Sequence, residues 1–288
     1  GAPGDLTDLG GQAPETQVWP GAHLGAEAFV HLEPLSCRAC HGDVTRHATL
    51  QRAALAAGQA SDDLGLVRLG ELDAAAQRDV CARCHLQGDM ALELAPTPRG
   101  GPQPDDAPAR RVVLVPAEAD DDFRFVGQLE RLALSACFQG AQETLTCTTC
   151  HEPHQSVAAQ GTASFDARCQ TCHAAELCVR PDDLRVADVT GEAARSEDGC
   201  VDCHVRRSQP FDLAHLRTAD HFVRRSLPLP SVQPAREQAD RDGVLRVFHD
   251  GRLDAALATT AGRRWEQGLQ ALGFFKQGRL DAAAAVFA

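Results

Sequence analysis

Five copies of one short pattern, C-x-x-C-H, constrain this chain of 288 residues more than any other feature. Ten of its 12 cysteines lie in these copies. A single C-x-x-C is weak evidence, because zinc ribbons and thioredoxin-like proteins also use it. The five copies are Cys37, Cys40 and His41; Cys81, Cys84 and His85; Cys147, Cys150 and His151; Cys169, Cys172 and His173; and Cys200, Cys203 and His204.

The histidine at the fifth position of every copy makes the pattern specific. His accounts for 12 of the 288 residues, so chance would place it after all five cysteine pairs only about once in 10⁷. A c-type haem needs this arrangement, because two thiols bond to the haem vinyl groups and the next His binds the iron. The sequence therefore predicts five haem c groups with their iron, with zinc or disulfide chemistry as the alternative.

The other side of each iron needs a second ligand if the haem serves only in electron transfer. Seven histidines lie outside the motifs. We expect His249 to be structural and the single Met, Met90, to fill a gap in the core. The distal candidates are His31, His47, His154, His215 and His221, with His23 in reserve. Ligation by two imidazoles favours low-potential haems, because Met ligation raises the potential.

The composition fits a protein whose core is built partly from cofactors. Tyr is absent, and aromatic residues make up only 5% of the chain. The net charge of -12 argues against nucleic acid and anionic membranes as main partners. No apolar stretch reaches the length of a membrane span. The chain opens GAPGDLTDLG without a visible leader, so an exported protein would be a mature form.

Two cysteines, Cys137 and Cys178, lie outside the motifs. Export disfavours free thiols, so a disulfide between them is the first expectation, and two buried free thiols are the alternative.

The chain divides into three parts by composition. We expect a pentahaem domain over 1–226, a linker over 227–240 and a helical segment over 241–288. Short helices are predicted at 47–57 and 71–81, and RVVLV at 111–115 could form a strand.

The C-terminal segment contains the sequence GRLDAA twice, beginning at 251 and at 278. Helical spacing from 263 to 288, broken at Gly278, would place Trp265, Leu269, Leu272 and Phe275 on one face. This segment resembles one tetratricopeptide unit, and the alternative is a plain helical hairpin packed on the core.

Three stretches resemble exported multihaem cytochromes c that carry tetratricopeptide repeats. They are SACFQG…LTCTTCHEPH at 135–154, CVDCHVRRSQPFDLAHLRTADHFVRR at 200–225 and CRACHGDVTRH at 37–47. The resemblance spans roughly residues 30–225. It implies a mainly α, loop-rich multihaem cytochrome c fold organised around stacked haems, with a C-terminal tetratricopeptide-like helical segment.

The resemblance also implies roles for particular residues. It gives axial positions to His47, His154 and one or both of His215 and His221, and matches Cys137 and Cys178 to cysteines outside the haem motifs. Members often carry a further CxxCH near the N-terminus, and none precedes Cys37 here. His23, His31 or a neighbouring subunit would then supply the missing ligand.

Two classes of function follow. The first is an electron carrier without catalytic activity, exported to the periplasm or the cell exterior, with redox proteins or copies of itself as partners. A subunit of an extracellular filament is a sharper version of it. The second is a nitrogen-compound oxidoreductase with one open haem, although CxxCK and Tyr, used by two such groups, are absent. A weaker possibility is a docking module in the C-terminal helices.

Overall fold

The computed structural model describes ten stretches of the chain, all within one unit, residues 35–288. They are residues 37–42, 44–61, 63–93, 111–116, 123–173, 199–210, 212–213, 216–225, 244–249 and 253–287. His23, His31, Cys178, His215 and the predicted linker lie outside them.

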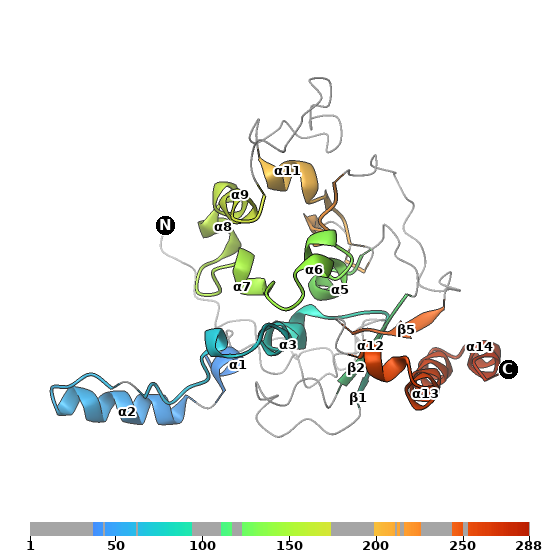
Figure 1. Ribbon diagram of the computed structural model, residues 1–288, viewed down its shortest axis with the longest axis horizontal. Helices are drawn as coiled ribbons and strands as arrows, with labels where there is room; N and C mark the ends of the chain where they lie inside the picture. The colour runs from blue at the N-terminus through green and yellow to red at the C-terminus, as the bar shows by residue number, and fades with distance from the viewer. Residues whose placement is uncertain are drawn as a thin grey trace, which may run out of the picture. The chain divides into compact units, whose positions relative to one another are not determined.

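Helices outnumber strands among the described residues, which agrees with a mainly α fold (Figure 1). The helices are α1 (Arg38–His41), α2 (Thr45–Ala56), η3 (Leu69–Glu71), α3 (Ala74–His85), α5 (Gln128–Leu132), α6 (Ala136–Gly140), α7 (Cys147–Cys150), α8 (Val157–Gln160), α9 (Thr162–Gln170), α11 (Cys200–His204), α12 (Asp254–Leu257), α13 (Thr260–Lys276) and α14 (Leu280–Ala285). No described helix has both the length and the apolar character needed to cross a bilayer.

Two of these helices confirm the local predictions. Helix α2 covers most of the predicted 47–57. The helix predicted at 71–81 begins later, at Ala74, because the Asp73 side chain caps it by accepting a hydrogen bond from the Ala76 N–H at 2.8 Å. It also runs on to His85, so the second motif forms its last turn.

A three-stranded antiparallel sheet joins distant parts of the sequence. Its order is β1 (Met90–Glu93), β2 (Arg111–Pro116) and β5 (Leu245–Val247). Met90 pairs with Leu114, which in turn pairs with Val247. Strand β2 confirms the strand considered at 111–115, whereas β5 shows that the segment around His249, expected to be helical, is extended. A second, two-stranded sheet pairs β3 (Arg207–Ser208) with β4 (Thr218–Ala219).

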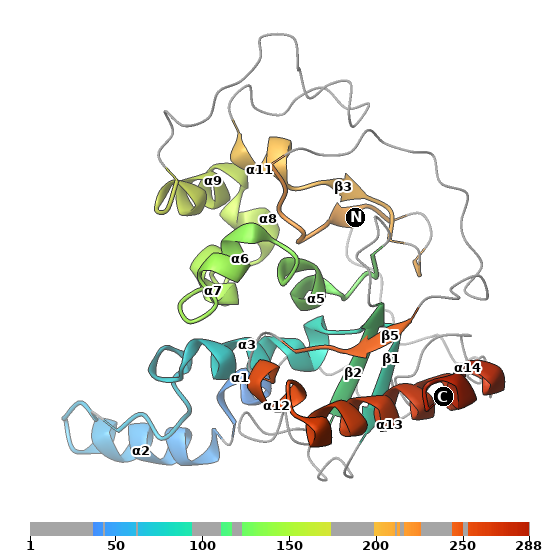
Figure 2. The same ribbon diagram turned by 45° about the vertical axis from the view of Figure 1, so that its right-hand side comes forward.

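Helix α13 packs against the three-stranded sheet (Figure 2). The shared core contains Met90 and Leu114 from the sheet and Leu269 and Phe274 from the helix. Met90 is 6% exposed, so it fills the core as expected. The segment after 241 therefore supplies both a strand and a helix to one core, and the predicted domain division stays a prediction.

Only one of the four residues expected on one face of α13 is buried. Leu269 is buried, but Trp265, Leu272 and Phe275 are 42%, 41% and 62% exposed. A Cβ atom on Gly273 would lie 2.4 Å from Cδ1 of Leu114. Because Gly273 has no side chain, the helix can approach the sheet on this side. The hydrophobic pattern alone did not reveal that contact.

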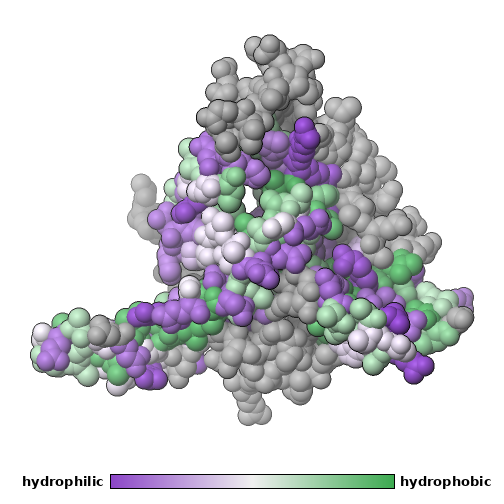
Figure 3. Space-filling view, viewed as in Figure 1, coloured by the Kyte–Doolittle hydropathy of each residue, from purple (hydrophilic) through white to green (hydrophobic). Residues whose placement is uncertain are grey.

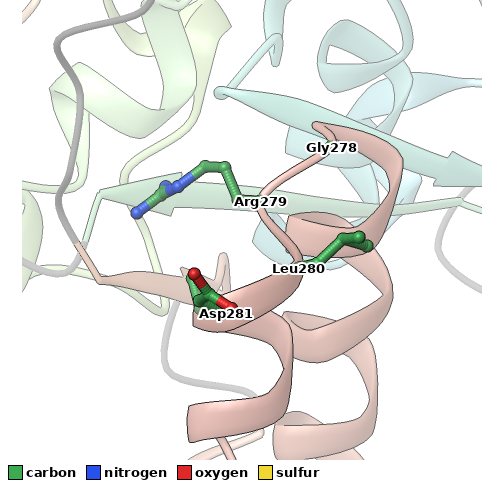
Figure 4. Close-up of a pocket in the computed structure, with 5 residues that line it drawn as sticks. Gly278, Arg279, Leu280 and Asp281 are labelled. Carbon is green, nitrogen blue, oxygen red and sulfur yellow. The ribbon is translucent and has the colours of Figure 1, made fainter.

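The predicted break at Gly278 is confirmed. Gly278 has a φ of 75°, a conformation that favours glycine, and α14 begins two residues later. An open pocket at this turn is lined by Gly278, Arg279, Leu280, Asp281 and Ala282 (Figure 4). None of these residues belongs to a C-x-x-C-H motif.

Candidate haem-binding site

The same local turn recurs in three of the motifs. The backbone N–H of His41 donates to the carbonyl of Cys37 at 2.9 Å, and His151 donates to Cys147 at 2.9 Å. His173 donates to Cys169 at 3.0 Å. Residues three and four apart share a face of a helical turn, so each turn directs both thiols and the imidazole to one side. This is the arrangement that covalent haem attachment requires.

The remaining two motifs also lie on helices. The second forms the C-terminal turn of α3, and the fifth is helix α11. All five motifs are therefore helical at least in part, although α1, α7 and α11 have only 4, 4 and 5 residues. Helix α7 is held by a capping box in which Thr146 and Thr149 bond to each other's backbone N–H groups.

Neighbouring motifs in the sequence are also neighbours in space. Helix α3 contacts α7, α7 contacts α9, and α9 contacts α11. The Arg83 guanidinium in the second motif donates to the carbonyl of Ala39 in the first. The Val201 N–H in the fifth motif donates to Asp166, on the helix of the fourth, at 2.9 Å. Each motif is thus in contact with the next one in the sequence.

A buried arginine links the second motif to the third. Arg78 lies on α3 and is 2% exposed. Its Nη1 donates to the carbonyls of Gln142 and Leu145 at 2.7 and 2.8 Å, and its guanidinium lies over the Phe138 ring. These contacts hold the loop that enters α7, because both carbonyls would otherwise lack a partner in the interior.

Several candidate histidines share one hydrogen-bonding pattern. Nδ1 of His41 lies 2.7 Å from the carbonyl oxygen of Val67, and Nδ1 of His204 lies 2.7 Å from that of Arg224. Nδ1 of His47 lies 2.5 Å from the Leu64 carbonyl oxygen. A carbonyl can only accept, so Nδ1 carries the proton and Nε2 carries the lone pair that a metal needs. Metal-binding histidines usually have such a partner on the other nitrogen.

Two pairs of imidazoles face each other across the motifs. The rings of His41 and His154 have centres 6.1 Å apart and planes inclined by 1°. The rings of His151 and His221 have centres 6.0 Å apart and planes inclined by 25°. Each pair joins the histidine of one motif, predicted as a proximal ligand, to a histidine predicted as a distal ligand.

These separations fit a metal ion held between the rings. Two imidazoles bound to one ion from opposite sides, each through a metal–nitrogen bond of about 2 Å, have centres about 6 Å apart. Stacked aromatic rings also reach this distance. The hydrogen bonds at Nδ1 are compatible with the metal, because Nδ1 of His154 lies 3.1 Å from a Glu152 carboxylate oxygen and Nδ1 of His221 lies 3.2 Å from the Ala219 carbonyl. Both therefore keep Nε2 for coordination.

Burial lowers the pKa of both histidines of the second pair. Desolvation lowers the pKa of His151, and the nearby His85 lowers it further. Desolvation also lowers the pKa of His221. Both imidazoles are therefore held neutral, which is the form that binds a metal.

Thiols of different motifs lie close enough to influence one another. A hydrogen bond from Cys81 lowers the pKa of Cys147, whereas the pKa of Cys81 is raised by the same contact. Desolvation, with help from Cys200, raises the pKa of Cys169 to about 11. Desolvation likewise raises the pKa of Cys40 and of Cys150.

Other candidates have different surroundings. Nδ1 of His85 contacts Oε1 of Gln128 at 2.9 Å, and His173 is exposed. Nδ1 of His249 lies 3.2 Å from Asp254, consistent with a structural role. Cys137 is half-buried on α6, and its predicted partner Cys178 lies outside the described residues.

A closed metal cage is not found in the part of the chain that the structure describes. There, no group of three or more His, Cys, Asp or Glu side chains could hold a metal ion. A haem iron needs only two protein ligands, because the porphyrin supplies the rest. The space-filling view shows an opening among the helices around α7, α9 and α11 (Figure 3). Paired imidazoles beside cysteine turns thus fit haem better than a four-ligand zinc site.

The sequence did not reveal the residues that hold His221 in place. Arg131 forms a buried ion pair with Asp220, and the Ser135 hydroxyl donates to the His221 carbonyl at 3.2 Å. The one signal in the sequence is that Asp220, a carboxylate, directly precedes the candidate ligand His221. Nothing in the sequence around Arg131 or Ser135 indicates this contact.

Comparison with known proteins gives one match. Residues 140–177, which include the third and fourth motifs, match the family model of a doubled CXXCH motif. No curated protein and no solved structure matches the chain. The doubled motif is a covalent attachment sequence for c-type haem, and the described turns and imidazole pairs agree with that chemistry. The match indicates that this region is cytochrome c-like and binds haem covalently.

Proposed function

We propose that the protein is an electron carrier with five covalently bound haems, one at each C-x-x-C-H motif. The observation that carries the proposal is the pairing of His41 with His154 and of His151 with His221 at about the spacing of two axial ligands. The cysteines and histidine of each motif would hold a haem, which would supply one-electron ferrous/ferric chemistry. The polypeptide holds the attachment positions close together, and burial lowers the pKa of His151 and of His221, which keeps these two imidazoles neutral.

The pairing connects motifs that are distant in sequence. His154 follows the third motif but faces the proximal histidine of the first. His221 follows the fifth motif but faces the proximal histidine of the third. The third motif would therefore adjoin both ends of the series, which supports electron exchange among all five positions.

Three haems remain without an assigned distal ligand, those of His85, His173 and His204. Of the seven spare histidines, His154 and His221 are paired and His249 contacts Asp254. Four are left for these three haems: His23, His31, His47 and His215. His47 supports this proposal, because its Nδ1 donates to a carbonyl and its Nε2 is left to bind a metal.

The partners in this proposal are redox proteins or further copies of the chain, which would form a filament. The protein would act outside the cytoplasm, in the periplasm or beyond the cell. This location follows from the chemistry of c-type haem attachment in the family that the sequence resembles. Sedimentation of the haem-loaded protein over a range of concentrations separates a discrete carrier from a polymer.

Mass spectrometry and spin-state spectroscopy of the haem-loaded protein test the proposal. We expect an intact mass that exceeds the polypeptide by five haems and an iron spectrum that is entirely six-coordinate and low-spin. A mass without these increments would overturn the proposal. A high-spin haem that binds added ligands would favour the alternative, an oxidoreductase for nitrogen compounds.

A further inference from the structure

An ion pair in the interior lies directly beside His221. Arg131, on α5, is 5% exposed, and Asp220, which follows β4, is 1% exposed. The guanidinium makes two bonds to the carboxylate, Nε to Oδ1 at 2.8 Å and Nη2 to Oδ2 at 2.7 Å. This two-pronged contact fixes the orientation of the carboxylate as well as its position.

The ion pair is built into a network that shapes the backbone on both sides of His221. Asp220 also accepts from the Phe222 N–H at 3.0 Å, and its own N–H donates to the Arg206 carbonyl at 2.8 Å. The Arg131 guanidinium lies 5.4 Å from the centre of the Phe222 ring. The residues before and after His221 are thus tied to α5 through Arg131.

A second attachment reaches the same loop from the start of α6. Ser135 is fully buried. Its hydroxyl donates to the His221 carbonyl at 3.2 Å and accepts from the Val223 N–H at 2.9 Å. Helices α5 and α6 therefore hold the loop at several points within four residues, while the His221 side chain extends towards His151.

Stability alone is a weak explanation for such a pair. Removing two charges from water is costly, and apolar side chains of similar volume often stabilise a core as well or better. The cost is justified where one defined geometry is required, and Asp220 adjoins a residue whose imidazole must meet its partner within a narrow range of distance and angle.

We propose that Arg131, acting through Asp220, is a positioning residue that holds His221 as the axial ligand opposite His151. This inference rests on the proposed function, because it requires a haem at the third motif. Arg131 itself is not one of the proposed ligands. Its effect is to keep the loop in the one conformation that brings the His221 ring to within 6.0 Å of the His151 ring.

The chain provides a matched control. Arg124 pairs with Asp89 at 3.1 Å, and the two side chains are 8% and 7% exposed. The pair resembles Arg131 and Asp220 in chemistry and burial. Asp89 precedes Met90, which lies in the sheet core and not at a haem motif. Loss of this pair should loosen the protein without releasing a ligand.

The experiment compares Arg131→Lys, Arg124→Lys, His221→Ala and the double variant Arg131→Lys/His221→Ala, each haem-loaded. Intact mass counts the haems, and electron paramagnetic resonance measures the high-spin ferric fraction. We expect five haems in every variant. Arg131→Lys and His221→Ala should each convert up to one haem in five to high spin, and added imidazole should restore low spin. The double variant should show no more high-spin iron than His221→Ala, and Arg124→Lys should show none.

The outcomes separate two failures. Wild-type protein without five haem increments would overturn the proposed function itself. Three results would each overturn the positioning role while leaving the haems in place. They are five low-spin haems in Arg131→Lys, more high-spin iron in the double variant than in His221→Ala, and as much high-spin iron in Arg124→Lys as in Arg131→Lys. Should Arg131→Lys fail to accumulate, Asp220→Asn takes its place, because it keeps the shape of the carboxylate and removes its charge.

Discussion

The imidazole of His41 lies parallel to that of His154, with ring centres 6.1 Å apart and planes inclined by 1°. One ring belongs to the first motif, and the other follows the third. Their Nδ1 atoms face different acceptors, the Val67 carbonyl and the Glu152 carboxylate. Both rings are thereby oriented with Nε2 available, which is the condition for a shared metal ion.

Replacing His154 with Ala should leave one haem five-coordinate. We expect the intact mass to keep all five haem increments, because no thioether is lost, while one haem in five becomes high-spin. Electron paramagnetic resonance measures that fraction. His249→Ala is the control, since Nδ1 of His249 lies 3.2 Å from Asp254 and His249 belongs to neither imidazole pair. Full low-spin character in His154→Ala would remove His154 from the ligand set.

Replacing Glu152 with Gln should raise the reduction potential of one haem. A carboxylate that accepts from Nδ1 makes the imidazole a stronger electron donor, which favours ferric iron. The neutral amide introduced by Glu152→Gln would be a weaker acceptor, so we expect the reduction potential to rise in a single titration step. Spectroscopic redox titration measures it. An unchanged titration curve would mean that Glu152 does not act on His154.

Replacing Arg78 with Met should destabilise the loop that enters α7, the helix of the third motif. The Gln142 and Leu145 carbonyls would both lose their buried donor. We expect a loss of about 2–4 kcal/mol in the free energy of unfolding, measured by denaturant titration followed by circular dichroism. Arg68→Met is the comparison, because Arg68 pairs with Glu71 at the surface and should cost less than about 1 kcal/mol.

Two glycines of α13 should respond in opposite ways to Ala. A Cβ atom on Gly273 would meet Leu114 at 2.4 Å, whereas one on Gly268 would meet nothing within 4 Å. Gly273→Ala should cost about 1–3 kcal/mol through overpacking, and Gly268→Ala should gain about 0.5–1 kcal/mol through helix propensity. Thermal unfolding ranks the two variants, and equal shifts would contradict the contact between α13 and the sheet.

Glu130 should make stability depend on pH. Burial raises the pKa of Glu130, even though the N–H groups of Gly88 and Gln87 donate to it at 2.7 and 3.1 Å. With a folded pKa above the unfolded value, the folded protein binds this proton more tightly. The contribution of Glu130 is therefore most favourable at low pH and is lost as pH rises from the unfolded to the folded pKa.

Replacement by Gln isolates that contribution. The free energy of unfolding of wild type and of Glu130→Gln is measured from about pH 4 to 7, a range that spans ordinary and raised carboxyl pKa values. The stability of wild type relative to Glu130→Gln should fall as the pH rises. Parallel curves for the two proteins would show that Glu130 has the same pKa in the folded and unfolded states.

Local structure was predictable where neighbouring residues decide it. The helix over α2 and the break at Gly278 follow from helix propensity and from the backbone freedom of glycine. Strand β5 was missed. Its three residues carry a weak signal, and they become a strand because β2 offers an antiparallel edge far away in the sequence.

The sequence by itself determined the cofactor chemistry of this protein. Two thiols and an imidazole within five residues are held by one helical turn, so their spacing is sufficient to identify a haem attachment position. Only the tertiary structure decided which imidazoles face each other. His154 and His221 meet the histidines of other motifs because non-local packing, including the Arg131–Asp220 ion pair, brings distant turns together. A spacing pattern is local and contains no record of those contacts.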